Sequence, residues 1–171
     1  MPDRGSLTFL LGGARSGKSL HAEHLISQFG SPWHYIATAQ AFDDEMAERI
    51  ALHKSRRDSR WTTHNAPLDL TAALDAIPDG APLLLDCLTL WLSNVLLAER
   101  DVAAESRALS HTLARPRGPW FVVSNEVGLG IVPDNALARR FRDDAGRLNQ
   151  MVAAGADSVL FMVAGLPMKV K

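Results

Sequence analysis

The sequence predicts an α/β fold in which a mostly parallel central sheet is flanked by helices. Short apolar runs rich in β-forming residues alternate along the chain with longer segments of helical periodicity. This alternation is typical of sheets whose parallel strands are joined by crossing helices. A glycine-rich motif stands between the first apolar run and the first helical segment, and polar residues follow several later runs. We expect strands at Leu7–Leu11, Trp33–Ala37, Leu83–Leu85, Trp120–Ser124 and Ser158–Val163.

The helical segments fill the intervals between these strands. A chain of 171 residues has the size of one domain, so we expect a single domain over residues 1–171. No apolar run approaches the roughly 20 residues that a transmembrane helix needs, and the N-terminal run is too short for a signal peptide. We therefore expect a cytoplasmic protein without membrane insertion. The expected helices are Ser19–Phe29, Asp43–Arg57, Leu68–Ala76, Leu88–Arg100, Val102–Ala114 and Asn135–Ala154.

The charge balance argues against a nucleic-acid partner. Lys and Arg number 18 against 19 for Asp and Glu, so no net positive field attracts a polyanion. Any basic site must therefore be local. The one cysteine, Cys87, excludes an internal disulfide and a cysteine-rich zinc site, and its apolar neighbours indicate a small core residue.

The glycine-rich motif has the full pattern G-x-x-x-x-G-K-[ST] of a phosphate-binding loop. Its glycines allow several backbone N–H groups to point at phosphate oxygens, and the helix that follows adds its N-terminal dipole. Lys18 is expected to reach the β- and γ-phosphates, and the Ser19 hydroxyl to bind Mg²⁺. The sequence therefore predicts a site for a nucleoside triphosphate, formed by Gly12, Gly13, Ala14, Arg15, Ser16, Gly17, Lys18 and Ser19.

Polar residues also follow later strands, at the edge where ligands bind in parallel sheets. Asp86 ends an apolar run and is expected to hold Mg²⁺ together with Ser19, although an aspartate in this place is also a common helix cap. The segment Thr38–Gln40 follows the second strand. Glu126 follows the fourth strand, where it would position water, metal or a substrate hydroxyl.

A basic helical segment follows the second strand. Arg49 and His53 are four residues apart, and Arg56 and Arg57 extend the same general side. Such a run is either a solvated basic surface or a phosphate-handling surface with a histidine at its centre. Neighbouring cations disfavour protonation of an imidazole, so they would keep His53 neutral and nucleophilic. They would also stabilise charge on a transferring phosphoryl or nucleotidyl group.

Taken together, these motifs resemble the bifunctional adenosylcobinamide kinase/adenosylcobinamide-phosphate guanylyltransferase family of cobalamin biosynthesis. The resemblance covers nearly the whole chain. It rests on Gly12–Ser19, Tyr35–Ala39, Asp44–Ile50, His53 with Arg57 and Trp61, Leu84–Asn94, Ser124–Pro133, Arg139–Gln150 and Val163–Lys171.

The resemblance implies a RecA-like P-loop fold, a homotrimer and two reactions. In the first, ATP or GTP phosphorylates the aminopropanol hydroxyl of adenosylcobinamide. GTP then guanylylates a histidine with release of pyrophosphate, and GMP passes to adenosylcobinamide phosphate to give adenosylcobinamide-GDP. That histidine falls on His53, and Lys18 and Glu126 complete the expected catalytic residues. The further expected nucleotide contacts are Thr38, Ala39, Gln40, Lys54, Ser55, Arg56, Arg57, Asn65 and Asp86.

Asn65 departs from the family pattern, which usually places a glutamate near the guanine site after the tryptophan. An amide still hydrogen-bonds a base, but it lacks the bidentate acceptance that a carboxylate offers to guanine N1 and N2. We therefore expect a less strict preference for GTP over ATP. Two other classes of function stay open: a monofunctional P-loop kinase with His53 in a bystander position, and a P-loop switch whose hydrolysis drives changes in binding.

Overall fold

Seven strands form one sheet at the centre of this computed structural model, in the order β3-β2-β4-β5-β1-β6-β7. Neighbouring strands are parallel except β6 and β7, which form an antiparallel hairpin, so the predicted α/β fold is confirmed. The structure describes residues 5–41, 44–55 and 57–171, and at Glu45, Met46, Arg49, Leu52 and His53 it describes the backbone alone. The strands are β1 (Ser6–Gly12), β2 (Trp33–Ala37), β3 (Trp61–Asn65), β4 (Leu83–Asp86), β5 (Pro119–Asn125), β6 (Ser158–Val163) and β7 (Leu166–Lys169).

All six predicted helical segments form helices, and two of them begin at side-chain caps. Asp101 accepts the N–H of Ala104, and Asn135 accepts the N–H of Ala138, which satisfies donors that the first helical turn leaves free. No helix in the described ranges is long and apolar enough to cross a bilayer. The helices are α1 (Lys18–Ile26), α2 (Asp44–Ser55), α3 (Leu70–Asp75), α4 (Leu88–Leu97), α5 (Val102–Leu113) and α6 (Ala136–Gly155).

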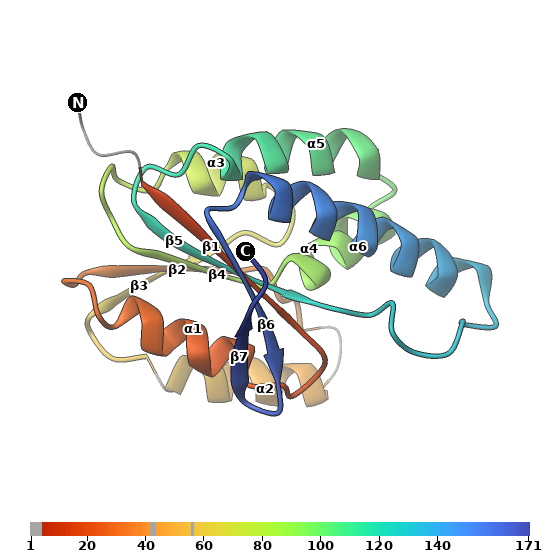
Figure 1. Ribbon diagram of the computed structural model, residues 1–171, viewed down its shortest axis with the longest axis horizontal. Helices are drawn as coiled ribbons and strands as arrows, with labels where there is room; N and C mark the ends of the chain where they lie inside the picture. The colour runs from red at the N-terminus through yellow and green to blue at the C-terminus, as the bar shows by residue number, and fades with distance from the viewer. Residues whose placement is uncertain (1–4, 42–43, 56) are drawn as a thin grey trace.

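Helices cover both faces of the sheet (Figure 1), as the crossover connections of parallel strands require. The helices α1 and α2 lie on one face, and α3, α4, α5 and α6 lie on the other. Alternate residues of each strand enter the two cores. Along β2, for example, Tyr35 joins the core beneath α1 while Ile36 joins the core beneath α3 to α6.

Two strands were not predicted from the sequence. The strand β3 reads Trp-Thr-Thr-His-Asn, without apolar alternation, because it lies at the sheet edge and pairs with β2 alone. The strand β7 contains Pro167 and is exposed along its length. A two-residue turn at Ala164 and Gly165, both with positive φ, returns the chain from β6 into β7. Positive φ at both central residues is the geometry that closes tight hairpins.

The basic helix is shorter than predicted, so Arg57 is not part of it. The helix α2 ends at Ser55, so Arg57 lies beyond its last turn and does not continue a helical face. The guanidinium of Arg57 instead lies 3.8 Å from the centroid of the Tyr35 ring. Arg56 and the side chains of Arg49 and His53 fall outside the described residues.

A histidine pair joins the two strands at one end of the sheet. Nδ1 of His34 on β2 lies 2.9 Å from Nε2 of His64 on β3, and the two rings are stacked with centroids 5.2 Å apart. His34 is buried, with 8% of its surface exposed. Burial lowers the pKa of His34 below its usual 6.5, and the proximity of His64 lowers it further.

We expect this pair to make stability depend on pH below 6.5. The unfolded chain takes up a proton at His34 in that range while the folded chain does not, so acidification favours unfolding. In His34→Gln the decline of unfolding free energy between pH 7.5 and pH 5.5 should be flatter than in the parent, as measured by urea denaturation. His111→Gln, at an exposed position on α5, is the matched control and should keep the parental slope. An unchanged slope in His34→Gln would contradict the expectation.

Candidate nucleotide-binding site

Several of the predicted site residues gather at the edge of the sheet where the parallel strands end. Gly12 at the end of β1 pairs with Asn125 at the end of β5, and Asp86 at the end of β4 pairs with Val123 of β5. The N–H of Glu126 then donates to the carbonyl of Gly12 at 3.0 Å. This register brings three segments together that are far apart in the sequence.

The phosphate loop runs from Gly12 to the first turn of α1. Gly17 has φ 91°, a left-handed conformation that glycine adopts without strain, and its carbonyl accepts the N–H of His21. A Cβ at Gly12 would lie 2.5 Å from Oγ of Ser16 and 2.9 Å from the backbone oxygen of Met162, so a larger residue there would force the loop or β6 to shift. The N–H of Gly165, in the turn between β6 and β7, donates to the carbonyl of Ser16 at 2.9 Å and holds the loop from the other side.

Lys18 is buried at the base of the loop, with 7% of its surface exposed. Its Nζ donates to the carbonyl of Gly13 at 2.6 Å. Burial lowers the pKa of Lys18, while the electrostatic influence of Cys87 and Asp86 opposes that shift. Burial also raises the pKa of the Cys87 thiol to about 11, so the thiol is neutral near pH 7.

Two polar atoms in the region have no partner within the part of the chain that the structure describes. Oγ of Ser16 is buried in the phosphate loop, and Nη1 of Arg57 is buried beside Tyr35. Buried polar groups are normally paired, because leaving a hydrogen bond unmade in the interior is unfavourable. These two atoms are therefore available to an acceptor or donor supplied by a ligand.

Thr38 was predicted to contact the nucleotide, and the structure gives its side chain a different position. Thr38 is fully buried, and its hydroxyl donates to the carbonyl of Cys87 at 2.7 Å and accepts the N–H of Cys87 at 2.9 Å. Its own carbonyl accepts Nδ2 of Asn94 at 2.8 Å. With these bonds made, Thr38 fixes the backbone beside Asp86. Ala39 and Gln40, which follow, are half-buried.

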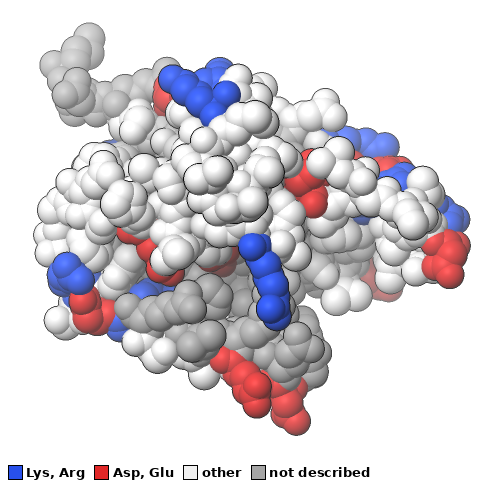
Figure 2. All heavy atoms as spheres, turned by 60° about the horizontal axis from the view of Figure 1, so that its bottom comes forward, with Lys and Arg blue, Asp and Glu red and all other residues white. Residues whose placement is uncertain are grey.

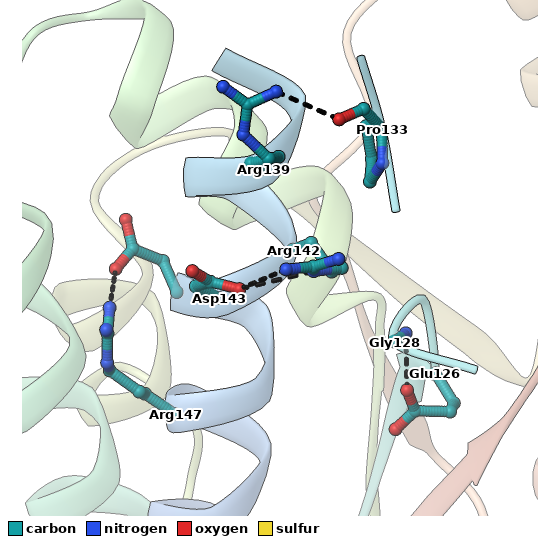
Figure 3. Close-up of polar contacts among 8 residues, drawn as sticks. Glu126, Gly128, Pro133, Arg139, Arg142, Asp143 and Arg147 are labelled. Atoms are coloured by element: carbon teal, nitrogen blue, oxygen red, sulfur yellow. Dashed lines mark hydrogen bonds and ion pairs between the residues drawn. The ribbon is translucent and has the colours of Figure 1, made fainter. Parts of the chain in front are cut away.

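The carboxylate of Glu126 turns back onto its own loop (Figure 3). Its Oε1 accepts the N–H of Gly128 at 2.5 Å. Farther along, Nη1 of Arg139 on α6 donates to the carbonyls of Pro133 and Asp134, at 3.0 and 2.7 Å. The loop between β5 and α6 is thus tied at both ends, and one carboxylate oxygen of Glu126 is engaged within the loop.

The remaining predicted nucleotide contacts that the structure describes lie at two different edges of the sheet. Asn65 is at the carboxyl edge with the phosphate loop, whereas the last turn of α2 leads into the start of β3 at the opposite edge. Asn65 ends β3 and is exposed, while Lys54 and Ser55 form the exposed last turn of α2. His53 directly precedes them in the same turn. Trp61 stacks edge-on against Tyr35, with ring centroids 6.1 Å apart, and completes an aromatic wall behind Arg57.

Several residues that shape the site were not singled out from the sequence. Nδ2 of Asn94 donates to the carbonyls of Thr38 and Pro67, joining the loops that follow β2 and β3. Asn149 on α6 accepts the hydroxyl of Ser124 at 2.8 Å. Side-chain amides on helices give no periodic signal, so only the placement of α4 and α6 against the sheet reveals these bonds.

The fold and the phosphate loop define a P-loop nucleotide-binding protein. A solved structure with the same fold is the RadB recombinase, with a TM-score of 0.54 and 19% identity over 92% of this chain and 74% of that one. The chain belongs to the family described as cobinamide kinase / cobinamide phosphate guanyltransferase, which it matches over residues 8–170. This agrees with the resemblance inferred from the motifs.

Two bifunctional relatives match the chain over nearly its full length. The adenosylcobalamin biosynthesis protein CobP of Pseudomonas aeruginosa is 49% identical over 165 residues, which cover 95% of each chain. The adenosylcobalamin biosynthesis protein CobU of Salmonella typhimurium is 45% identical over 182 aligned positions, with 96% of this chain and 99% of the relative covered.

We expect Thr38→Val to destabilise the protein because it removes both hydrogen bonds to Cys87 and leaves that buried N–H and carbonyl unpaired. The free energy of unfolding should fall by about 1–3 kcal/mol, measured by urea denaturation. Thr63→Val, at an exposed position on β3, is the control and should change it by less than about 0.5 kcal/mol. Equal effects of the two substitutions would show that the Thr38 hydroxyl does not hold this edge together.

Proposed function

We propose that this chain, acting as one domain, phosphorylates adenosylcobinamide with ATP or GTP and then transfers GMP from GTP to the product, forming adenosylcobinamide-GDP. Family membership supports the pair of reactions. The observation that carries the proposal is the phosphate loop, where Lys18 is buried against a backbone carbonyl beside an unpaired Ser16 hydroxyl. Phosphate oxygens would replace that carbonyl as the acceptor for Lys18. They would also accept a hydrogen bond from the Ser16 hydroxyl.

In the phosphoryl-transfer step, the loop holds the triphosphate while Lys18 neutralises charge on the departing phosphates. Asp86 and the hydroxyl of Ser19 would hold Mg²⁺, which supplies charge neutralisation to the phosphates. No three His, Cys, Asp or Glu side chains of the described residues gather into a metal site. Mg²⁺ is commonly held by one or two protein oxygens together with phosphates and water. Glu126, once rotated from Gly128, would accept the proton of the corrinoid hydroxyl.

In the nucleotidyl-transfer step, an imidazole nitrogen of His53 attacks the α-phosphorus of GTP, and pyrophosphate leaves with the bonding electron pair. A phosphate oxygen of the corrinoid then attacks the same phosphorus and displaces the imidazole. The unpaired Nη1 of Arg57 supports a role on the transferring group. Lys54, Ser55 and Arg56 would contact the nucleotide from the same end of α2, and Asn65 would contact the base from β3.

The test is covalent labelling with GTP that carries label in the α-phosphate. We expect acid-labile, alkali-stable label on the parent protein, as a phosphoramidate gives, and none on His53→Ala. His111→Ala, on the opposite face of the sheet, is the matched control and should label normally. Lys18→Ala should lower both labelling and phosphoryl transfer by about a hundredfold or more, since both use the loop.

The two steps can be separated in the same experiment. His53→Ala should still transfer phosphate from ATP to adenosylcobinamide, because the histidine serves the second step alone. Label that survives in His53→Ala would remove His53 from the mechanism. If adenosylcobinamide failed to stimulate turnover of ATP by the parent, the corrinoid would be the wrong substrate.

The chain is further proposed to assemble as a homotrimer through the loop between β5 and α6, which extends away from the sheet in Figure 1. This loop presents Leu129 and Ile131 with 81% and 98% of their surfaces exposed, and Val132 is also exposed. The bonds from Arg139 and Glu126 hold it in place. A contiguous apolar surface of this kind on an anchored loop is typical of a protein–protein interface.

Leu129→Ser combined with Ile131→Ser should therefore shift the assembly from trimer to smaller species. Size-exclusion chromatography with light scattering measures the mass directly. Leu97→Ser, an exposed leucine at the end of α4, is the control and should leave the trimer intact. A parent that runs as a monomer, or a double variant that stays trimeric, would contradict this interface.

A further inference from the structure

A hollow of about 550 Å³ adjoins the phosphate loop and plays no part in the steps derived above. It lies between α1 and the turn that joins β6 to β7, and its volume is within the range of small-molecule sites, roughly 300–1,000 Å³. The hollow is lined by Gly17, Leu20, His21, Glu23, His24 and Gly165.

The hollow lies on the opposite side of the phosphate loop from the residues proposed to hold guanine. The loop follows β1, and in the sheet β6 and β7 lie on one side of β1 while β5, β4, β2 and β3 lie on the other. Gly17 and Gly165 belong to the first side, and Asn65 and Arg57 belong to the second. A nucleoside attached to phosphates in the loop therefore has two directions in which to extend.

The walls of the hollow suit a flat, uncharged ring. Leu20 is 65% exposed on α1, although it is apolar, and the imidazoles of His21 and His24 lie beside it with ring centroids 6.4 Å apart. Burial and then the proximity of His24 lower the pKa of His21, which favours a neutral imidazole near pH 7. The His21 imidazole and the Leu20 side chain offer stacking and apolar contact, and the Glu23 carboxyl group in the same lining offers no positive charge for phosphate.

The floor of the hollow allows close approach of a ligand to the backbone. Gly17 and Gly165 both have positive φ, and a Cβ at Gly17 would lie 3.1 Å from the Cα of Gly165. The bond from the Gly165 N–H to Ser16 fixes this floor to the phosphate loop. Figure 2 turns the α1 and α2 side forward, and among the residues described there the acidic and basic side chains lie in small separate groups.

We infer that this hollow is a second nucleoside subsite, in which the purine base of the triphosphate used for phosphoryl transfer packs against Leu20, His21 and His24. The inference rests on the proposed function, since it assumes that one phosphate loop serves both reactions. Guanylyl transfer then uses the α2 and β3 side of the loop, and phosphoryl transfer uses the β6 and β7 side. The two reactions use the same phosphate loop and differ in where the base of the nucleotide binds.

The test compares nucleotide with bare phosphate. Leu20→Ala combined with His24→Ala removes two exposed walls of the hollow while leaving the loop unchanged. The KM for ATP in phosphoryl transfer should rise about tenfold, as loss of a stacking and apolar surface predicts, with kcat near the parental value. Affinity for inorganic tripolyphosphate and labelling of the protein by GTP should stay unchanged. Leu97→Ala, with 60% of Leu97 exposed on α4, is the matched control and should leave every value parental.

Binding of a non-hydrolysable ATP analogue, measured without corrinoid, tests the hollow even if the corrinoid assay fails. A weaker analogue affinity in the double variant, with unchanged tripolyphosphate affinity, supports the subsite. Equal analogue affinity in parent and variant would overturn it. An equal loss of GTP labelling in the double variant would also overturn it, because both steps would then use one base position. A rise in the KM for adenosylcobinamide alone would overturn it as well, because the hollow would then bind the corrinoid.

Discussion

Hydrogen bonds from the ends of two different strands hold the phosphate loop in shape. The N–H of Glu126, just after β5, donates to Gly12, and the N–H of Gly165, just after β6, donates to Ser16. Both bonds exist because β1 lies between β5 and β6 and is parallel to each. The loop is thereby set before a nucleotide arrives, so binding does not have to order it. Within the loop, Nζ of Lys18 donates to the carbonyl of Gly13.

The buried polar residues of this part of the molecule fall into two groups, those with hydrogen bonds made inside the protein and those with an unpaired polar atom. Thr38 and Asn94 are buried with their hydrogen bonds made inside the protein, which fixes the ends of β2 and β4 beside the loop. Ser16 and Arg57 each leave a buried polar atom without a partner in the described structure. Because an unmade buried hydrogen bond costs free energy, the first pair stabilises the fold, whereas the second pair leaves this cost unrelieved within the described structure.

The sequence predicted most of the fold and the phosphate side of the site, and it missed particular elements for physical reasons. The five apolar runs became strands because they are buried in the sheet, where a continuous apolar pattern survives. The edge strands β3 and β7 have no such burial, so their residues carry no pattern. Thr38 was expected at the nucleotide because it follows a strand, yet its hydroxyl turns toward Cys87. The same pattern of residues permits either orientation, and packing selects one.

By itself the sequence determined the triphosphate-binding motif, the α/β class and the family. These depend on the spacing of residues along the chain and on buried strands, which appear in the sequence as runs of apolar residues. Tertiary structure alone decided how the loop is held and what adjoins it. The turn at Gly165 is far from Ser16 in the chain, and only the parallel pairing of β1 with β6 brings them within hydrogen-bonding distance. The hollow beside Leu20 also depends on tertiary structure. It is bounded by α1 and by the β6–β7 hairpin, which the local sequence pattern did not predict. Spacing in the sequence fixes which groups are present, and long-range strand pairing fixes which of them meet.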